Sequence, residues 1–347
     1  MVWARVMLGR RRLMAASLLL ACGIKDAKAE EKRIALVIGN GDYAHVQKLP
    51  NAVNDAHVMA LELAQPSHGF QVTYGHDLSR ASMWSTINDF VDAVHRYDAA
   101  LFYFAGHGVQ INNANWLVPV DISDDLRRGE DVQEQSVDMA RVAAMIANAN
   151  PRGINMLIID ACRDNPFAGN GIGTGAPRGL ATTEGANGVM ILYSAGSGQT
   201  ALDGLTRDDS HGLFTQELLA AIRRPGVPVS QMMADLQDVV RQRAQTVHHL
   251  QTPAYYAEQG SNFMFTPPTS DLPAARGPPG ESQIAIVPAV LPQAPANAVK
   301  PDASAKSQVA TKPSAQGIAK PTQAWHVNKN PSAVYDPDKT CTSLGTC

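Results

Sequence analysis

Residues 154–166 read INMLIIDACRDNP, and this stretch decides how the rest of the chain is interpreted. Its first six residues are almost all apolar, which is typical of a strand buried on both faces of a sheet. Cys162 follows this run and is flanked by the charged residues Asp160 and Arg163, whereas a cysteine of the core normally lies inside an apolar run. Open parallel sheets form their sites beyond the carboxyl ends of their strands, so Cys162 is a candidate functional residue.

Similar apolar runs recur along the chain, and stretches with helical spacing of apolar residues separate them. This alternation predicts an α/β fold with a mainly parallel sheet and helices on both faces. The predicted strands are 33–40 (RIALVIGN), 70–77, 99–106 (AALFYFAG), 154–162 and 188–196 (GVMILYSAG), and the predicted helices are 51–65, 79–95, 136–150, 212–224 and 230–247.

A histidine follows another of these strands. In FAGHGVQ, His107 comes after the 99–104 strand and lies between Gly106 and Gly108. Each residue alone has an ordinary explanation, a loop histidine satisfied by hydrogen bonds or a buried structural thiol. Together they favour a nucleophilic pair, since an imidazole helps to generate a thiolate and then protonates the leaving group. The glycines beside His107 expose an N–H group that is a candidate oxyanion donor.

The N-terminal residues have the pattern of an export signal. An arginine cluster precedes the apolar run 13–24 (LMAASLLLACGI), which is too short to span a bilayer permanently. The sequence AKA at 27–29 then fits a signal-peptidase site, so residues 1–29 are predicted to be a signal peptide. The protein is therefore expected in the periplasm or outside the cell. Cleavage after Ala29 and lipidation at Cys22, which would anchor the chain to the envelope, both stay open, as does a short membrane anchor.

The composition changes near residue 266. Of the 22 prolines, 13 lie between Pro267 and Pro337, and the only aromatic residues of this part are Trp325 and Tyr335. Such a composition does not bury enough apolar surface to offset the loss of chain entropy. The sequence therefore predicts a single folded domain at 32–265 and a disordered Pro/Ala-rich tail at 266–347.

The net charge of the mature chain argues against binding of nucleic acid. Residues 1–29 carry six basic residues and one acidic residue, so the mature chain has a net charge of −8 against −3 for the whole chain. It has no basic patch of the kind that binds nucleic acid.

Cys22 belongs to the signal, and Cys341 and Cys347 are expected to form a small disulfide loop in an oxidising compartment. Cys162 is then left without a disulfide partner in the domain.

The order of the motifs resembles the caspase and metacaspase family of cysteine peptidases. His107 precedes Cys162 by 55 residues, close to the spacing of about 50 found in caspases. The resemblance implies a caspase-like fold and a cysteine endopeptidase that acts on proteins or peptides through a thioester. The matching segments cover almost the whole of 33–265, in the order RIALVIGNGDY, LPNAVNDAHVMA, LFYFAGHGVQ, NWLVPVD, INMLIIDACRDNP, VMILYSAGSGQTALD and HGLFTQELLAAI.

The resemblance also assigns residues to roles. His107 matches the catalytic histidine and Cys162 the nucleophile, and the N–H groups of Gly108 and Cys162 match the oxyanion hole. Asp160 and Asp55 match the acids of the metacaspase primary specificity pocket. Two carboxylates in one pocket favour Arg or Lys before the scissile bond, because a buried guanidinium needs charge-assisted partners.

Some positions depart from the family pattern. Arg163 and Asp164 follow the cysteine where the family often has a small residue or histidine and then glycine, and Ala105 replaces the serine of many metacaspases. The arginines with which caspases select aspartate have no clear counterpart.

The glycine-rich stretch 163–188 matches the loop that family members often cleave, with Arg178 as the candidate self-cleavage site. Some relatives depend on calcium, but the sequence identifies no calcium site, no other metal-ligand cluster and no cofactor.

Two other functional classes compete with the peptidase interpretation. Family members that lose activity keep the fold as binding scaffolds, although retention of both His107 and Cys162 argues against this. A nucleotide-binding doubly wound domain is disfavoured, because no G-x-G-x-x-G follows RIALVIGN and no G-x-x-x-x-G-K-[ST] occurs.

Overall fold

The computed structural model describes residues 31–162, 166–167, 172, 188–206, 209–257, 260–269 and 284–288. The predicted signal peptide, Arg178 and the Cys341–Cys347 loop lie outside the described residues, as does most of the predicted tail. The chain divides into two units, 1–294 and 295–347, and all described residues lie in the first.

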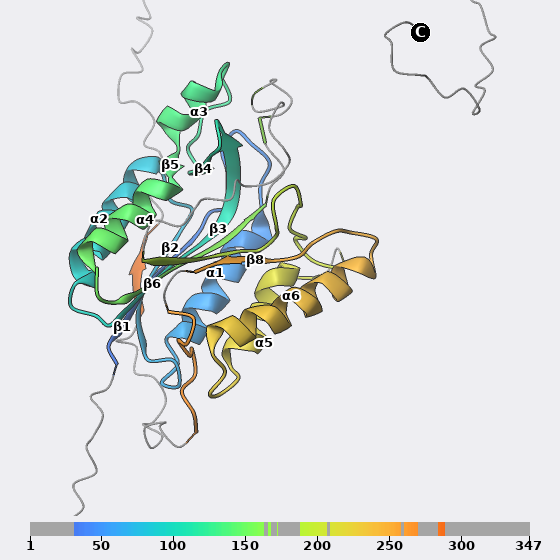
Figure 1. The fold of residues 1–347 in the computed structure, drawn as a ribbon. Helices are drawn as coiled ribbons and strands as arrows, with labels where there is room; N and C mark the ends of the chain where they lie inside the picture. Colours follow the sequence, from blue (N-terminus) through green and yellow to red (C-terminus); the bar gives the residue numbers. More distant parts are fainter. Residues whose placement is uncertain are drawn as a thin grey trace, which may run out of the picture. The chain divides into compact units, whose positions relative to one another are not determined.

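A mostly parallel sheet forms the centre of the first unit (Figure 1). Its strands run in the order β8-β7-β6-β3-β1-β2-β9, and β4 and β5 extend it next to β3. All neighbours along the main path are parallel except β7 and β8. The strands are β1 Arg33–Gly39, β2 Phe70–His76, β3 Ala99–Ile111, β4 Ala114–Leu117, β5 Val137–Asp138, β6 Ile154–Cys162, β7 Val189–Tyr193, β8 Ala254–Tyr256 and β9 Ile284–Val287. The predicted α/β class with a mainly parallel sheet is confirmed.

Helices cover both faces of this sheet, as Figure 1 shows. α1, α5 and α6 pack on one face, and α2 and α4 pack on the other. Alternate residues of β1 explain how a single strand serves both layers, since Val37 belongs to the first core cluster and Leu36 to the second. The helices are α1 Pro50–Leu63, α2 Arg80–Val94, α3 Gly129–Gln135, α4 Met139–Ala149, α5 Leu213–Ile222 and α6 Val229–Gln245.

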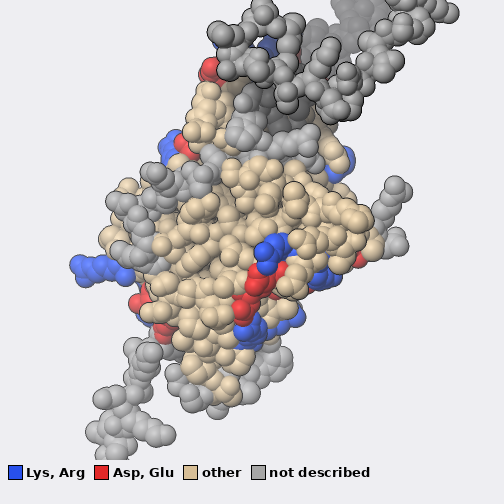
Figure 2. All heavy atoms as spheres, turned by 45° about the vertical axis from the view of Figure 1, so that its right-hand side comes forward, with Lys and Arg blue, Asp and Glu red and all other residues tan. Residues whose placement is uncertain are grey.

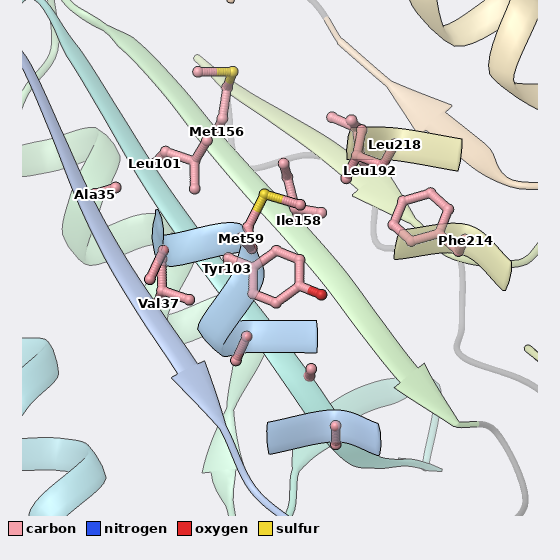
Figure 3. Packing of buried hydrophobic residues seen from close by; sticks show 14 of the residues in the cluster. Ala35, Val37, Met59, Leu101, Tyr103, Met156, Ile158, Leu192, Phe214 and Leu218 are labelled. Carbon is pink, nitrogen blue, oxygen red and sulfur yellow. The ribbon is translucent and has the colours of Figure 1, made fainter. Parts of the chain in front are cut away.

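One core cluster packs α1 and α5 against the sheet (Figure 3). Met59 of α1 packs over Tyr103 of β3, and Phe214 of α5 lies beside them against the sheet. All three side chains are buried. The buried hydroxyl of Tyr103 lies 2.9 Å from Thr215 Oγ1 of α5, so this polar group is satisfied within the core. The apolar packing thus fixes α1 and α5 relative to β3 and β6.

The helix boundaries differ from the predictions by up to three residues. Ser79 begins α2 as expected, and its Oγ accepts the N–H of Ser82 at 3.2 Å. The helix predicted from 136 begins only at Met139, because the carboxylate of Asp138 caps it and accepts the N–H of Ala140 at 2.9 Å. α6 begins one residue before the predicted start, after Pro228.

The strand that carries His107 is longer than predicted. β3 continues through Gly106 and Gly108 to Ile111, because its last four residues pair with the antiparallel strand β4. The prediction ended this strand at Gly106, before His107, with the apolar run. β6 ends at Cys162, as predicted. Both residues therefore belong to strands rather than to the loops that follow them.

One segment of the predicted tail is part of the sheet. Residues 284–287 form β9, which pairs in parallel with β2 from Val72 to Gly75. The sequence IAIV has the β-branched composition of a strand, but it is short and surrounded by prolines and glycines. The prediction of a tail rested on the composition of 266–347 as a whole, which so short a segment hardly changes.

The outer surfaces of α5 and α6 carry paired charges. Arg224 lies 2.5 Å from Asp235, and Arg243 contacts Glu217. On the face drawn in Figure 2, basic and acidic atoms lie next to one another and form no broad field of one sign. Among the described residues, no helix has the length and apolar character needed to cross a membrane.

Candidate active site

The strands β3 and β6 bring the two candidate catalytic residues into register. They pair in parallel from Ala99 with Ile154 up to His107 with Cys162, so the Cα atoms of the last pair are direct partners. Neighbouring strands lie about 4.8 Å apart. These strands are therefore neighbours, and the backbones of His107 and Cys162 meet at the carboxyl end of the sheet. Gly108 follows on the same strand.

The imidazole of His107 is buried, with 3 % of the residue exposed. Its Nε2 atom lies 2.8 Å from the backbone carbonyl oxygen of Gln47. A carbonyl oxygen only accepts hydrogen bonds, so Nε2 carries the proton of the neutral ring and Nδ1 carries the lone pair. The carbonyl thus sets the tautomer, and Nδ1 is the atom that takes up a proton when the ring acts as a base.

A buried tyrosine positions the backbone of the same histidine. The hydroxyl of Tyr43 accepts the N–H of His107 at 2.8 Å and donates to the carbonyl of Val118 at 3.3 Å. The two rings lie 4.6 Å apart between centroids. A side chain at position 106 would clash with this tyrosine, because a β-carbon built on Gly106 would lie 2.7 Å from the Tyr43 hydroxyl. Tyr43 therefore anchors the part of β3 that carries His107.

The loop that supplies Tyr43 and Gln47 is itself held by Asp77. One carboxylate oxygen of Asp77 accepts the N–H groups of Gly41 at 2.9 Å and Asp42 at 2.8 Å. Asp77 adopts a left-handed backbone conformation with φ 50°, which aspartate tolerates better than most residues. The turn after β2 thus supports the loop that orients His107.

Replacing Tyr43 by Phe tests this arrangement. The change leaves the buried N–H of His107 without its acceptor, which costs about 1–3 kcal/mol. We expect the Tm to fall by about 2–4 °C for each kcal/mol lost. If the protein cleaves peptides, the variant should have a lower kcat and an unchanged KM. Calorimetry and steady-state kinetics measure both. The matched control is Tyr97→Phe, whose hydroxyl bonds Gln71 at an exposed position. Equal effects of the two changes would contradict the role of Tyr43.

A second group of polar residues surrounds Asp55 of α1. This residue is 4 % exposed. Its two carboxylate oxygens accept the N–H of Gly212 at 3.2 and 3.1 Å. Nδ1 of His211 lies 2.9 Å from Oδ1. Both partners come from the turn before α5, so the packing of α1 against α5 buries the carboxylate.

Asp160 of β6 approaches the same turn from the sheet. Its Oδ2 accepts a hydrogen bond from Thr215 Oγ1 at 2.6 Å, and the Tyr103 hydroxyl lies 3.4 Å away. A side-chain carbon built at Gly212 would lie 3.0 Å from Asp55 Oδ2 and 4.0 Å from Asp160 Oδ2. The structure therefore brings together the two acids named from the sequence, and Gly212 leaves the space between them open.

A third acid, Asp203, belongs to this group and was missed in the sequence. Its charge contributes to the raised pKa values of both Asp55 and Asp160. The side chain of Asn51 in α1 holds its backbone through a 2.6 Å bond to the Asp203 carbonyl. Asp203 lies in the irregular segment after β7, where no periodic pattern marks it. We call Asp55, Asp160 and Asp203 the acidic cluster.

The ionisation of the acidic cluster reflects its burial. Burial, with the nearby charge of Asp160, raises the pKa of Asp55 to about 9. Burial raises the pKa of Asp160 to about 6, although the hydrogen bonds from Thr215 and Tyr103 oppose this shift. Burial also raises the pKa of Asp203. Neighbouring buried carboxylates resist ionisation together unless a cation lies between them. The cluster is therefore suited to hold a positively charged group.

The raised pKa of Asp55 makes stability depend on pH. Between the unfolded value near 4 and the folded value of about 9, the folded state binds more protons than the unfolded state. The free energy of unfolding therefore falls as the pH rises through this range. Asn at this position keeps an acceptor for Gly212 and does not ionise. We expect Asp55→Asn to raise the Tm at pH 8 by at least about 2–4 °C, with a smaller gain at pH 5. Thermal melts at both pH values measure this, and an unchanged or lower Tm at pH 8 would contradict it.

The described residues contain no group of three or more His, Cys, Asp or Glu side chains arranged to hold a metal ion.

The family comparison agrees with the fold. The family model described as "Caspase domain" matches residues 32–264. This match includes β3 with His107, β6 with Cys162 and Asp160, α1 with Asp55, and the segment between β7 and α5 that contains Asp203.

Two curated relatives are similar over shorter parts. The Paracaspase of Dictyostelium discoideum is 23 % identical over 226 residues, which are 61 % of this chain and 52 % of the relative. The human Mucosa-associated lymphoid tissue lymphoma translocation protein 1 is 25 % identical over 138 residues, 40 % of this chain and 16 % of the relative. The chain thus spans about half or less of the length of these relatives. Since the caspase model covers most of the chain, and the fold is the mostly parallel α/β sheet expected for it, the chain belongs to the caspase-domain family.

Proposed function

We propose that this protein is a cysteine endopeptidase that cleaves peptide bonds after Arg or Lys. The observation that carries the proposal is the register of His107 with Cys162 on β3 and β6, together with the Gln47 carbonyl that leaves Nδ1 of His107 as the basic atom. Membership in the caspase-domain family supports it.

The proposed reaction has two steps. Nδ1 of His107 takes the proton of the Cys162 thiol, and the thiolate attacks the peptide carbonyl carbon. The N–H groups of Gly108 and Cys162 stabilise the oxyanion, the C–N bond breaks, and His107 gives its proton to the leaving amine. Water then attacks the thioester and loses a proton to His107, and the acid product leaves as Cys162 regains its proton.

The acidic cluster supports the specificity for basic side chains. Asp55 and Asp160 are close to one point beside Gly212, and Asp203 adds a third carboxylate. Among the described residues, no Lys or Arg forms an ion pair with Asp55 or Asp160. A substrate guanidinium would supply the missing positive charge and make charge-assisted hydrogen bonds with the carboxylates.

Reporter peptides test both parts of the proposal. The full chain is incubated with otherwise identical peptides ending in Arg, Lys, citrulline or Asp, with and without calcium, beside a Cys162→Ala variant. We expect release of the reporter from the Arg and Lys peptides only, and only with Cys162. Absence of Cys162-dependent cleavage of every peptide would favour the alternative function, an inactive caspase-fold scaffold that binds partner proteins.

Two further proposals rest on the sequence alone. The 1–29 signal indicates export, with the tail or a lipidated Cys22 available for association with the envelope. Basic specificity would also let the protein cleave itself at Arg178. Intact mass of the full chain after incubation, compared with Cys162→Ala, measures this cleavage.

A further inference from the structure

The residue beside Asp55 that no part of the proposed reaction uses is His211. Its Nδ1 lies 2.9 Å from Asp55 Oδ1. Its side chain is 27 % exposed, while that of Asp55 is only 5 % exposed. The side chain of Gln216 donates to the His211 carbonyl at 2.9 Å and fixes the turn. His211 therefore connects a buried carboxyl group to solvent.

The groups that face Asp55 come from every element packed around it. Asp160 lies on β6, Tyr103 on β3, and Asp203 and His211 on the segment between β7 and α5. Apart from the histidine, each is acidic or neutral. Two adjacent carboxyl groups in such surroundings do not both ionise while the site is empty, because each charge disfavours the other. The empty cluster therefore retains a proton, and the pKa of about 9 places it on Asp55 at neutral pH.

A bound cation reverses this preference. A guanidinium or ammonium group close to Asp55 and Asp160 favours their ionised forms, so the retained proton has to leave. His211 provides the route, since its Nδ1 faces Asp55 and the ring reaches solvent. Burial lowers the pKa of His211, so the imidazole is neutral near pH 7 and accepts rather than repels the proton. The O–H bond of Asp55 breaks, and the proton passes to water.

We propose that His211 is a specificity-determining residue whose hydrogen bond to Asp55 couples the binding of a basic side chain to the release of a proton. The inference rests on the proposed function and deepens it, because it makes the affinity for Arg or Lys depend on pH. The sign follows from linkage. Since binding releases a proton, affinity rises with pH, by up to about 10-fold per unit, until Asp55 is ionised in the empty site as well.

Calorimetry on the full chain carrying Cys162→Ala tests this directly. A peptide ending in Arg is titrated at pH 7 in two buffers with different ionisation enthalpies, and the difference gives the number of protons released. We expect close to one proton for the Arg peptide and none for the same peptide with citrulline, its neutral isostere. The affinity for the Arg peptide should rise between pH 6 and 8, whereas that for the citrulline peptide should stay level.

Replacing His211 by Gln in the same background tests the role of the histidine. A Gln amide donates to Asp55 and stabilises the ionised carboxylate. We expect a downward shift of the pH profile by about one unit, about 10-fold tighter binding at pH 6, and proton release that falls to about half a proton at pH 8. The matched control is His57→Gln, an exposed histidine of α1 whose ring contacts Tyr74. It should keep the original profile, and thermal melts confirm that each variant is folded.

The outcomes separate this inference from the proposed function. Binding of the Arg peptide without proton release overturns the inference and leaves basic specificity standing. The same holds if His211→Gln and His57→Gln give identical pH profiles. Failure of the Arg peptide to bind at any pH overturns the proposed specificity itself, and the inference with it. The proton count of the parent protein needs no substitution at His211, so it tests the coupling of binding to proton release even if that variant does not fold.

Discussion

Replacement of Cys162 by Ala is expected to abolish peptide cleavage, with a loss in kcat/KM of at least about 10⁴-fold. The reason is that the thiolate forms the covalent intermediate, and no other described cysteine exists in the domain to replace it. His107→Ala should cost a similar factor, because the two residues act as one unit and the double variant should be no worse than either alone. Steady-state kinetics with the Arg reporter peptide measure all three proteins.

A structural control accompanies this prediction. Thermal melts should give free energies of unfolding for Cys162→Ala and the parent that agree within about 1 kcal/mol, because Ala and Cys differ little in size. A His57→Gln variant, which alters an exposed histidine of α1, should retain full activity. Substantial cleavage by Cys162→Ala would show that another group acts as the nucleophile.

The second large effect concerns specificity. Asp160→Asn should lower kcat/KM for the Arg peptide by about 10²-fold or more, because one partner of a buried charge pair is lost. Cleavage of the citrulline peptide should hardly change, since a neutral side chain makes no ion pair. Asn retains an acceptor for the Thr215 hydroxyl, which limits damage to the fold. The ratio of the two kcat/KM values is the measurement.

Asp89→Asn is the matched control for this change. Asp89 is an exposed residue of α2, on the opposite face of the sheet from α1 and α5, and its replacement alters the net charge equally. If it lowers the Arg-to-citrulline ratio as much as Asp160→Asn does, the effect arises from overall charge and not from the acidic cluster.

The secondary structure was predictable where periodicity is strong. The apolar strands at 33–40 and 154–162 and the Ser79 cap all have local signals, and the structure confirms them. The extension of β3 through His107 was not predictable in this way, because it depends on pairing with β4. Local sequence favours a strand end at Gly106, but the tertiary contact overrides it.

The residues that surround the catalytic pair could not be predicted from the sequence. Gln47 acts through a backbone carbonyl, which any residue supplies, so no side-chain pattern identifies it. Tyr43 was part of a matched motif but had no assigned role until its hydroxyl was found against His107. Asp203 lies near Asp55 and Asp160 in a segment that Asn51 of α1 contacts through the Asp203 carbonyl. Each contact joins parts of the chain far apart in sequence.

The most direct test of the central claim is covalent labelling. The full chain is treated with a peptidyl acyloxymethyl ketone ending in Arg, and the product is examined by intact mass and peptide mapping. The account predicts one adduct per chain, on Cys162, that is lost in His107→Ala and strongly slowed in Asp160→Asn. The same reagent ending in Asp should label far more slowly. Equal labelling by both reagents would contradict basic specificity, and the absence of any adduct on Cys162 would contradict the proposal of a Cys162 peptidase.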